Sequence, residues 1–407
     1  MLIIITQFIL FGFFLVSINY IDRKIWGTNY TPIAILGWPF FILLIICYIY
    51  LKINFKQFEL NSLVLPIWLG GLFSFWIGGF FLKFIFTKAK INLVQLNLSI
   101  NEFSITKYQL QLLITIAYPL IIIAGYKIYG VLLKFRFNIA DDEFQKNLGA
   151  GFIGHSILLL TILTIFFIIF FSEKNYKIHQ ILIILTTLLF AVLYGVKSWI
   201  IIPLISAFVG RIFLTKTKLK LKHIIYLIIP FLIFWLIYQI SLGMSSLNNK
   251  FIFNHIVDYL LSGPIGFSAH LDQNLPIGKN PEYAFTPLIN IFRFLIGKQP
   301  LDVISNYIVS IPTGFETNVK TFFGSLFIYG GYSYIITSFV LGLILYAYLL
   351  IVVLTINTKI APFFIINYSF MLGLLFMGWF EIYVIHLDFY EVPFFAFLMH
   401  FLLRLKL

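Results

Sequence analysis

The stretch FFGSLFIYGGYSYIITSFVLGLILYAYLLIVVL fills residues 322–354 and contains no charged side chain. A helix needs about 20 consecutive apolar residues to cross the hydrocarbon core of a bilayer. This run exceeds that length, and its Gly330-Gly331 pair predicts a bend or a tilt within it. The run therefore predicts a membrane-embedded helix rather than a helix in a soluble core.

Apolar runs of this kind recur along the whole chain. Of its 407 residues, 61% are apolar and 11% are charged, and the mean hydropathy is +1.00. An average soluble domain has about 25% charged residues. The composition excludes an ordinary globular enzyme, a disordered protein and a nucleic-acid binder. We predict an all-α polytopic membrane protein with about eleven spans, roughly at residues 2–20, 31–51, 63–86, 108–126, 152–172, 178–195, 198–214, 223–243, 322–354, 361–378 and 383–403.

The organisation expected from these spans is a single transmembrane domain over residues 1–407. Residues 244–321 form the only long non-spanning segment, which we expect to be an external loop between the eighth and ninth spans. Its apolar stretches at 256–271 and 287–295 predict short interfacial or re-entrant helices. Long loops are uncommon unless they are functional.

The net charge of +13 comes from 28 Lys and Arg against 15 Asp and Glu. The basic residues stand singly between apolar runs, so we interpret them as orientation signals rather than as a nucleic-acid surface. The densest basic segment, Lys216–Lys222, is expected in the cytoplasm, which places residues 244–321 outside. Cys47 is the single cysteine, so a disulfide within the chain and a cysteine-based metal cluster are excluded.

Acidic residues at the last predicted span form the first candidate site. Glu381 and Asp388 are seven residues apart, which predicts one shared helix face, with His386 and Glu391 close by. Charged groups in a span usually face the bundle interior or a water-filled cavity. The functional hypothesis is a carboxylate or histidine that acts as a catalytic base. The alternative is a structural ion pair with a basic residue of a neighbouring span.

Three isolated cations on the predicted outer side form the second candidate site: Arg136, Lys197 and Arg293. One arginine side chain can bind two phosphate oxygens at once, and lysine supplies a point charge. These residues are therefore predicted to bind a diphosphate. The alternative is that each side chain extends to the lipid headgroups. The sequence shows no Walker or Rossmann glycine loop and no HExxH pattern, so we expect no nucleotide, no metal and no other cofactor.

Three short patterns resemble those of a known family. They are Asp22-Arg23 with Thr31-Pro32, the segment Tyr259-Leu260-Leu261-Ser262-Gly263-Pro264, and the segment Thr317-Asn318-Val319-Lys320-Thr321-Phe322. With them, and with the turn at 195–198, the chain resembles the Wzy-type oligosaccharide repeat-unit polymerases, which include the O-antigen polymerases. Lys320 stands where an aromatic residue is common in that family.

The resemblance implies an enzyme that joins undecaprenyl-diphosphate-linked oligosaccharide repeats into O-antigen or capsular-type polysaccharide. The transfer would take place without a metal, at the outer face of a bacterial inner membrane. Tyr259, Asn318 and Thr321 would then bind substrate. Membrane lipids, a flippase and a chain-length regulator would be partners. A flippase or exporter of the same lipid-linked sugars, an O-antigen ligase and, as a weaker possibility, a membrane acyltransferase remain alternatives.

The charge distribution generates a topology prediction. In a Cys47-free background, Asn280→Cys should react with a membrane-impermeant maleimide from the outer side of the membrane, whereas Lys218→Cys should react only after permeabilisation. Labelling is read by a gel shift. Reaction of the cysteine at position 280 only after permeabilisation would contradict the assigned orientation.

Overall fold

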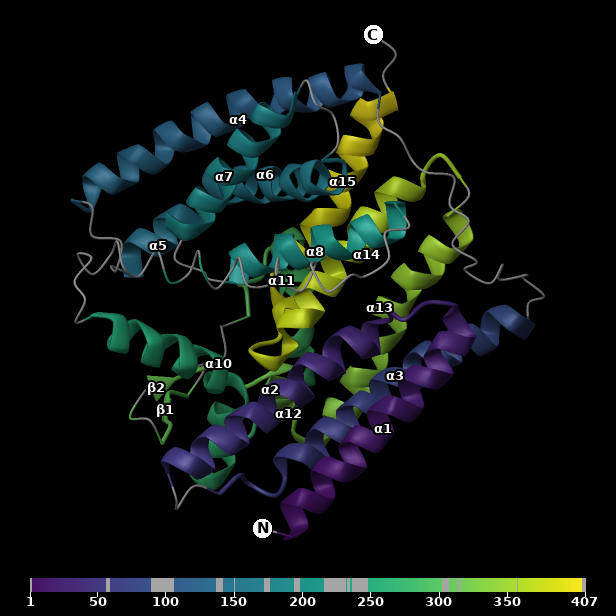
Figure 1. The fold of residues 1–407 in the computed structure, drawn as a ribbon, viewed down its shortest axis with the longest axis vertical. Helices are drawn as coiled ribbons and strands as arrows, with labels where there is room; N and C mark the ends of the chain where they lie inside the picture. The colour runs from purple at the N-terminus through teal and green to yellow at the C-terminus, as the bar shows by residue number, and fades with distance from the viewer. Residues whose placement is uncertain are drawn as a thin grey trace. The chain divides into compact units, whose positions relative to one another are not determined.

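The computed structural model describes residues 2–55, 59–88, 106–136, 142–149, 151–171, 176–193, 198–215, 248–301, 307–312, 314, 316–356 and 358–404, with Leu232 and Trp235. These residues are helical almost throughout (Figure 1). Seven stretches among them are long and apolar enough to cross a membrane. The prediction of an all-α polytopic membrane protein is confirmed, and the expected span at 223–243 lies outside the described residues apart from Leu232 and Trp235.

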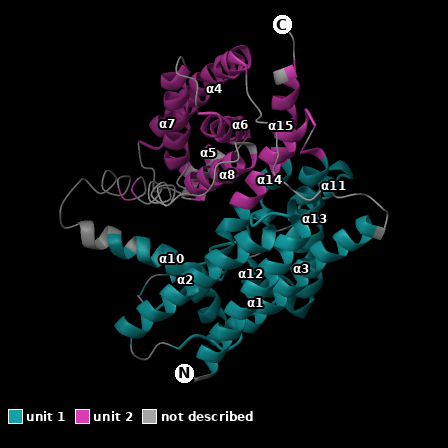
Figure 2. Cartoon of the chain, turned by 45° about the vertical axis from the view of Figure 1, so that its right-hand side comes forward, with its two compact units in different colours: residues 1–97, 242–354, 374–390 teal, residues 98–241, 355–373, 391–407 magenta. Residues whose placement is uncertain are grey.

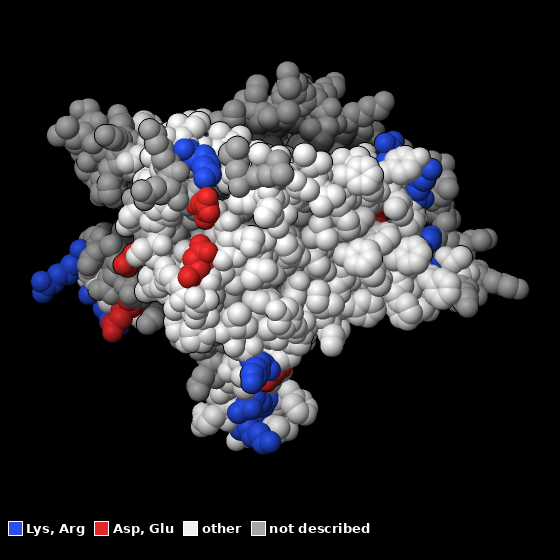
Figure 3. Space-filling view, turned by 90° about the horizontal axis from the view of Figure 1, so that it is seen from below, with Lys and Arg blue, Asp and Glu red and all other residues white. Residues whose placement is uncertain are grey.

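The long apolar helices are α1 (Leu2–Trp26), α2 (Pro32–Asn54), α3 (Val64–Lys88), α4 (Lys107–Lys134), α6 (Gly151–Ile169), α13 (Tyr334–Thr355) and α14 (Ala361–Phe376). The other α-helices are α5 (Asp142–Gly149), α7 (Lys177–Leu193), α8 (Ser198–Thr215), α10 (Asn248–Asp272), α11 (Thr286–Leu295), α12 (Phe322–Gly330) and α15 (Asp388–Arg404). On the face shown in Figure 3, charged side chains form a few small groups and most of the surface is uncharged. Such a surface suits a protein that contacts lipid.

The chain folds into two compact units (Figure 2). Unit 1 contains residues 1–97, 242–354 and 374–390, and unit 2 contains residues 98–241, 355–373 and 391–407. Each unit therefore uses three separate segments of the chain. In unit 2, α6 is buried over most of its length and packs against α4, α7 and α8.

Glycines allow α3 and α13 of unit 1 to pack closely. A Cβ atom at Gly342 would lie 2.0 Å from the carbonyl oxygen of Phe75, and one at Gly78 would lie 2.4 Å from that of Phe339. Helices in lipid associate through close packing of this kind, because lipid is as apolar as the side chains and gives no hydrophobic drive between them.

The bend expected at Gly330-Gly331 is present. Helix α12 ends at Gly330, the 3-10 turn η3 (Gly331–Ser333) follows, and Gly331 has a φ of 53°, which favours glycine. Phe323 packs at Gly71 and Ile335 packs at Gly70, so both ends of the α12 segment lie at the same level of α3. The crossing is therefore made by the 22 residues of α13.

The predicted external segment contains more regular structure than a loop. Residues 256–271 belong to α10, and residues 287–295 belong to α11 after the 3-10 turn η2 (Pro281–Phe285). Strand β1 (Val309–Ser310) then pairs antiparallel with β2 (Glu316–Thr317). The two apolar stretches are helical as expected.

The prediction of one helix through Glu381 and Asp388 is wrong. The chain passes through the 3-10 turns η4 (Met377–Trp379) and η5 (Tyr383–Ile385), and α15 begins only at Asp388. The carbonyl of Phe380 accepts a hydrogen bond from the N–H of Thr321, which is distant in sequence. In a continuous helix it would accept from the N–H four residues further along the chain. Glu381 and Asp388 therefore share no helix face.

The close helix contact predicts the effect of a single methyl group. Gly342→Ala should overpack α13 against α3 and lower the apparent Tm of the purified protein, because overpacking costs about 1–3 kcal/mol. Gly130→Ala is the matched control, since nothing lies within 4 Å of its new Cβ and alanine favours helix by about 1 kcal/mol. An unchanged Tm for Gly342→Ala would show that the two helices separate at little cost.

Candidate functional site

The residue before α12 and the residue after the 3-10 turn η4 are joined by a backbone hydrogen bond in unit 1. The backbone N–H of Thr321 donates to the carbonyl of Phe380 over 2.9 Å. Thr321 is fully buried and has a φ of 67°. Its Oγ1 accepts from the indole Nε1 of Trp68 at 3.0 Å and caps α12 by accepting from Gly324 N–H. With the bond from Ser325 N–H to its carbonyl, the strained residue is thus held by four hydrogen bonds.

Glycines of α10 let that helix pack directly on the segments that contain Thr321 and Phe380. A Cβ atom at Gly263 would lie 2.1 Å from the carbonyl oxygen of Trp379, and one at Gly266 would lie 2.5 Å from that of Val319. The ring of Tyr259 lies 4.3 Å from the ring of Phe380, centroid to centroid. The segments 259–264 and 317–322, which carry two of the three family-like patterns, are therefore neighbours.

Lys320 and Glu381 stand next to the hydrogen-bonded peptide groups. Lys320 is 4% exposed, and its Nζ donates to the carbonyl of Thr317 at 3.3 Å. Burial lowers the pKa of Lys320 to about 8, with Glu381 acting in the opposite direction. Burial raises the pKa of Glu381 to about 7, opposed by Lys320. The site thus holds an amine and a carboxyl group that both titrate near neutral pH.

His270 is the third titratable group near this pair. Its side chain is 1% exposed, and neither ring nitrogen meets hydrogen-bond geometry with a partner. Burial and then the charge of Lys320 lower the pKa of His270 to about 4, and the Pro276 backbone acts weakly the other way. The imidazole is therefore neutral at pH 7 and leaves Lys320 as the positive group of the cluster.

Glu381 is the predicted catalytic residue that the structure places in this cluster. Among the predicted substrate-binding residues, Asn318 is exposed beside Lys320, Tyr259 packs on Phe380, and Thr321 is buried as the cap of α12. Lys320 and His270 were missed as site residues. The one available signal was the position of Lys320 inside the quoted 317–322 pattern.

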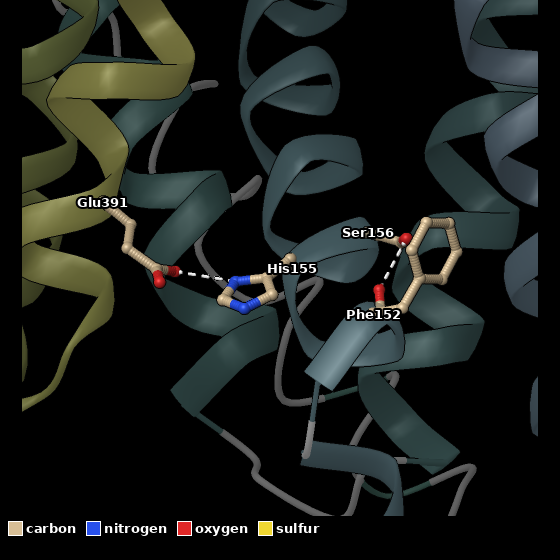
Figure 4. A network of polar contacts seen from close by, with 4 residues as sticks. All are labelled: Phe152, His155, Ser156 and Glu391. Carbon is tan, nitrogen blue, oxygen red and sulfur yellow. Dashed lines mark hydrogen bonds and ion pairs between the residues drawn. The ribbon is translucent and has the colours of Figure 1, made fainter.

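The other acidic-span residues lie elsewhere. His386 is exposed and stacks on Tyr383, with ring centroids 5.3 Å apart, while Asp388 begins α15. Glu391 belongs to unit 2, where its Oε2 lies 3.2 Å from Nδ1 of His155 on α6 (Figure 4). For Glu391, the structure therefore favours the alternative of an ion pair with a neighbouring helix.

The three predicted diphosphate-binding cations are not brought together within one unit. Arg293 lies on α11 of unit 1, where its Nε donates to the carbonyl of Gln299 at 2.5 Å. Arg136 is exposed in the turn after α4 of unit 2. Lys197 lies outside the described residues.

Comparison with known families covers most of the chain, including the Lys320–Glu381 cluster. A model of a family of unknown function (DUF6337) matches residues 54–407. The chain belongs to this family. No curated protein and no solved structure matches the chain.

The shifted pKa of Glu381 predicts a pH dependence of stability. Because its folded-state pKa of about 7 lies above its ordinary value of 4.5, the native protein binds more protons than the unfolded chain between these pH values. The stability that this group contributes is therefore present at low pH and is lost as the pH rises through about 7. Glu381→Gln should remove that loss, so the variant should gain stability relative to the native protein between pH 5 and pH 7.5, measured by thermal unfolding in detergent. An equal difference at both pH values would contradict the raised pKa.

Proposed function

We propose that this protein is a membrane glycosyltransferase that joins undecaprenyl-diphosphate-linked oligosaccharide repeats into a surface polysaccharide at the outer face of a bacterial inner membrane. The observation that carries the proposal is the position of the buried Lys320 and the half-buried Glu381 on either side of the Thr321–Phe380 hydrogen bond. Irregular backbone in a membrane protein is tolerated only where it is buried or lines a cavity, and broken helices often form substrate sites. The family-like patterns at 259–264 and 317–322 converge on the same place.

The proposed transfer assigns one role to each group of the pair. A hydroxyl of the acceptor repeat attacks the anomeric carbon of the donor. The new glycosidic C–O bond forms as the C–O bond to the diphosphate breaks, and the electron pair leaves with the diphosphate. Glu381 takes the hydroxyl proton, for which a pKa of about 7 is well matched. Lys320 stabilises the negative charge that develops on the leaving diphosphate.

Lys320 suits this role better than the cations selected from sequence. It is buried beside a carboxyl group, and a charge in a water-poor site acts more strongly than one in solvent. The transfer is proposed to need no metal, because the protein's own cation faces the leaving group.

An enzyme fits the cluster better than a flippase does. Transporters tend to place polar groups on several helices across the bilayer midplane. Here the amine and the carboxyl group lie on two segments that are joined by one backbone hydrogen bond, in an arrangement suited to proton transfer. An O-antigen ligase would use the same chemistry with a different acceptor, so the two enzymes differ in the product that they leave behind.

Removing either group should abolish polymerisation while the protein still inserts. Glu381→Gln should lower the rate by about 10²–10⁴, and Lys320→Ala should lower it by roughly 10²–10³. Gels of surface polysaccharide should then show a single repeat without the ladder. Activity should peak between about pH 7 and pH 8, because Glu381 must be deprotonated and Lys320 protonated.

Glu391→Gln is the matched control, because this residue pairs with His155 in unit 2 and should leave the ladder intact. Lys320→Arg should restore part of the activity by keeping the charge. A full ladder from both Glu381→Gln and Lys320→Ala at normal protein level would overturn the proposal. Loss of the single repeat together with the ladder would favour a flippase or a ligase.

A further inference from the structure

Helix α11 carries its apolar side chains on the outside. None of its residues is buried. Leu288, Ile291, Phe292 and Leu295 follow the i, i+3, i+4, i+7 spacing of one helix face, and they are 46%, 46%, 63% and 74% exposed. Phe294 and Ile296, at 81% and 49% exposed, flank this stripe on its two sides.

Two polar side chains of α11 are hydrogen-bonded to the segment that directly follows the helix. The Oδ1 of Asn290 accepts from Leu301 N–H at 2.6 Å, and Arg293 Nε donates to Gln299. Both residues lie opposite the apolar stripe, since successive helical residues are turned by about 100°. An amphipathic helix of a soluble protein buries its apolar face instead. The described residues leave this face of α11 exposed, which suits an apolar partner such as lipid.

The attachment of α11 is anchored in the core of unit 1. The turn η2 directly before it contains the fully buried Ala284, and the Thr286 hydroxyl donates to the Tyr283 carbonyl at 2.7 Å. Upstream, the N–H of Asn280 donates to the carbonyl of Tyr329 on α12 at 2.9 Å. The apolar stripe is therefore presented on a fixed support.

Charge identifies the kind of apolar partner. Residues 286–300 contain Arg293 and Lys298 and no acidic residue. A surface that is both apolar and anionic complements this segment, and a phospholipid leaflet provides its acyl chains below a layer of phosphates. Basic amphipathic helices with aromatic side chains bind at this boundary. Because the same chain crosses the membrane, a leaflet also lies within reach of α11.

We propose that α11 is an interfacial helix that lies in the phospholipid leaflet, with its Leu288–Leu295 stripe among the upper acyl chains and Arg293 and Lys298 at the phosphates. Because η2 is tied to α12, the leaflet then fixes the depth of α12 and of the Lys320 segment that precedes it. This binding does not depend on the proposed enzymatic activity.

Fluorescence quenching in nanodiscs tests the position of α11. The full chain with Cys47→Ser receives a single cysteine through Phe292→Cys or Leu295→Cys, labelled with an environment-sensitive fluorophore, in discs of phosphatidylglycerol and phosphatidylcholine. Lys279→Cys, at an exposed site before η2, is the matched control. Acyl-brominated phosphatidylcholine should quench the labels at 292 and 295 and shift their emission to the blue. Aqueous iodide should quench only the label at 279.

Two results would overturn the proposal. Equal iodide quenching at 292 and 279, without quenching by brominated lipid, would place α11 in water. Protection of the label at 292 from both quenchers, with disulfide cross-linking between copies of the unlabelled Phe292→Cys variant, would show that a second copy of the chain covers the stripe. Each result is read without any measurement of polymer synthesis.

Discussion

The hydrogen bond between Thr321 N–H and the Phe380 carbonyl is the contact on which the candidate site depends. Backbone groups away from water must be paired. Thr321 stands directly before α12 and Phe380 stands directly after η4. The N–H of Thr321 and the carbonyl of Phe380 are therefore paired with each other. Because Lys320 precedes one bonded residue and Glu381 follows the other, the same bond brings an amine and a carboxyl group together.

Burial gives this pair its chemistry. Removal of water disfavours both charges, so it lowers the pKa of Lys320 and raises that of Glu381, while their mutual attraction limits both shifts. The two values end near neutrality, where a carboxyl group can take a proton and an amine can still hold one. A neutral His270 beside them adds no competing positive charge. The glycines of α10 maintain the burial, because a side chain at Gly263 or Gly266 would force the helix away.

Sequence predicts the parts of this fold that depend on composition and misses those that depend on a distant partner. Hydropathy was sufficient for the long helices and for the helices at 256–271 and 287–295, and the Gly330-Gly331 pair was sufficient for the bend. Helical spacing failed at Glu381 and Asp388, because Thr321 takes the carbonyl that a continuous helix would use. Lys320 stands among polar residues and has the pattern of a loop charge. Lys320 is nevertheless buried, and α10 packs beside it, since a Cβ atom at Gly266 would lie 3.8 Å from its Nζ. No local pattern reports that contact.

The frame that holds the site also includes residues before the matched family region. Asp22 of α1 is 1% exposed and accepts hydrogen bonds from Trp76 Nε1 of α3, at 2.9 Å, and from the Tyr346 hydroxyl of α13. Near the start of α13, the Tyr334 hydroxyl donates to the Ile67 carbonyl of α3 at 3.1 Å. Helix α13 is thus fixed to α3 at two points along its length. The α12 segment is held by α13 on one side and by the hydrogen bond to Phe380 on the other. Asp22, which the family-like pattern singled out, therefore acts on the site by holding the helices that position it.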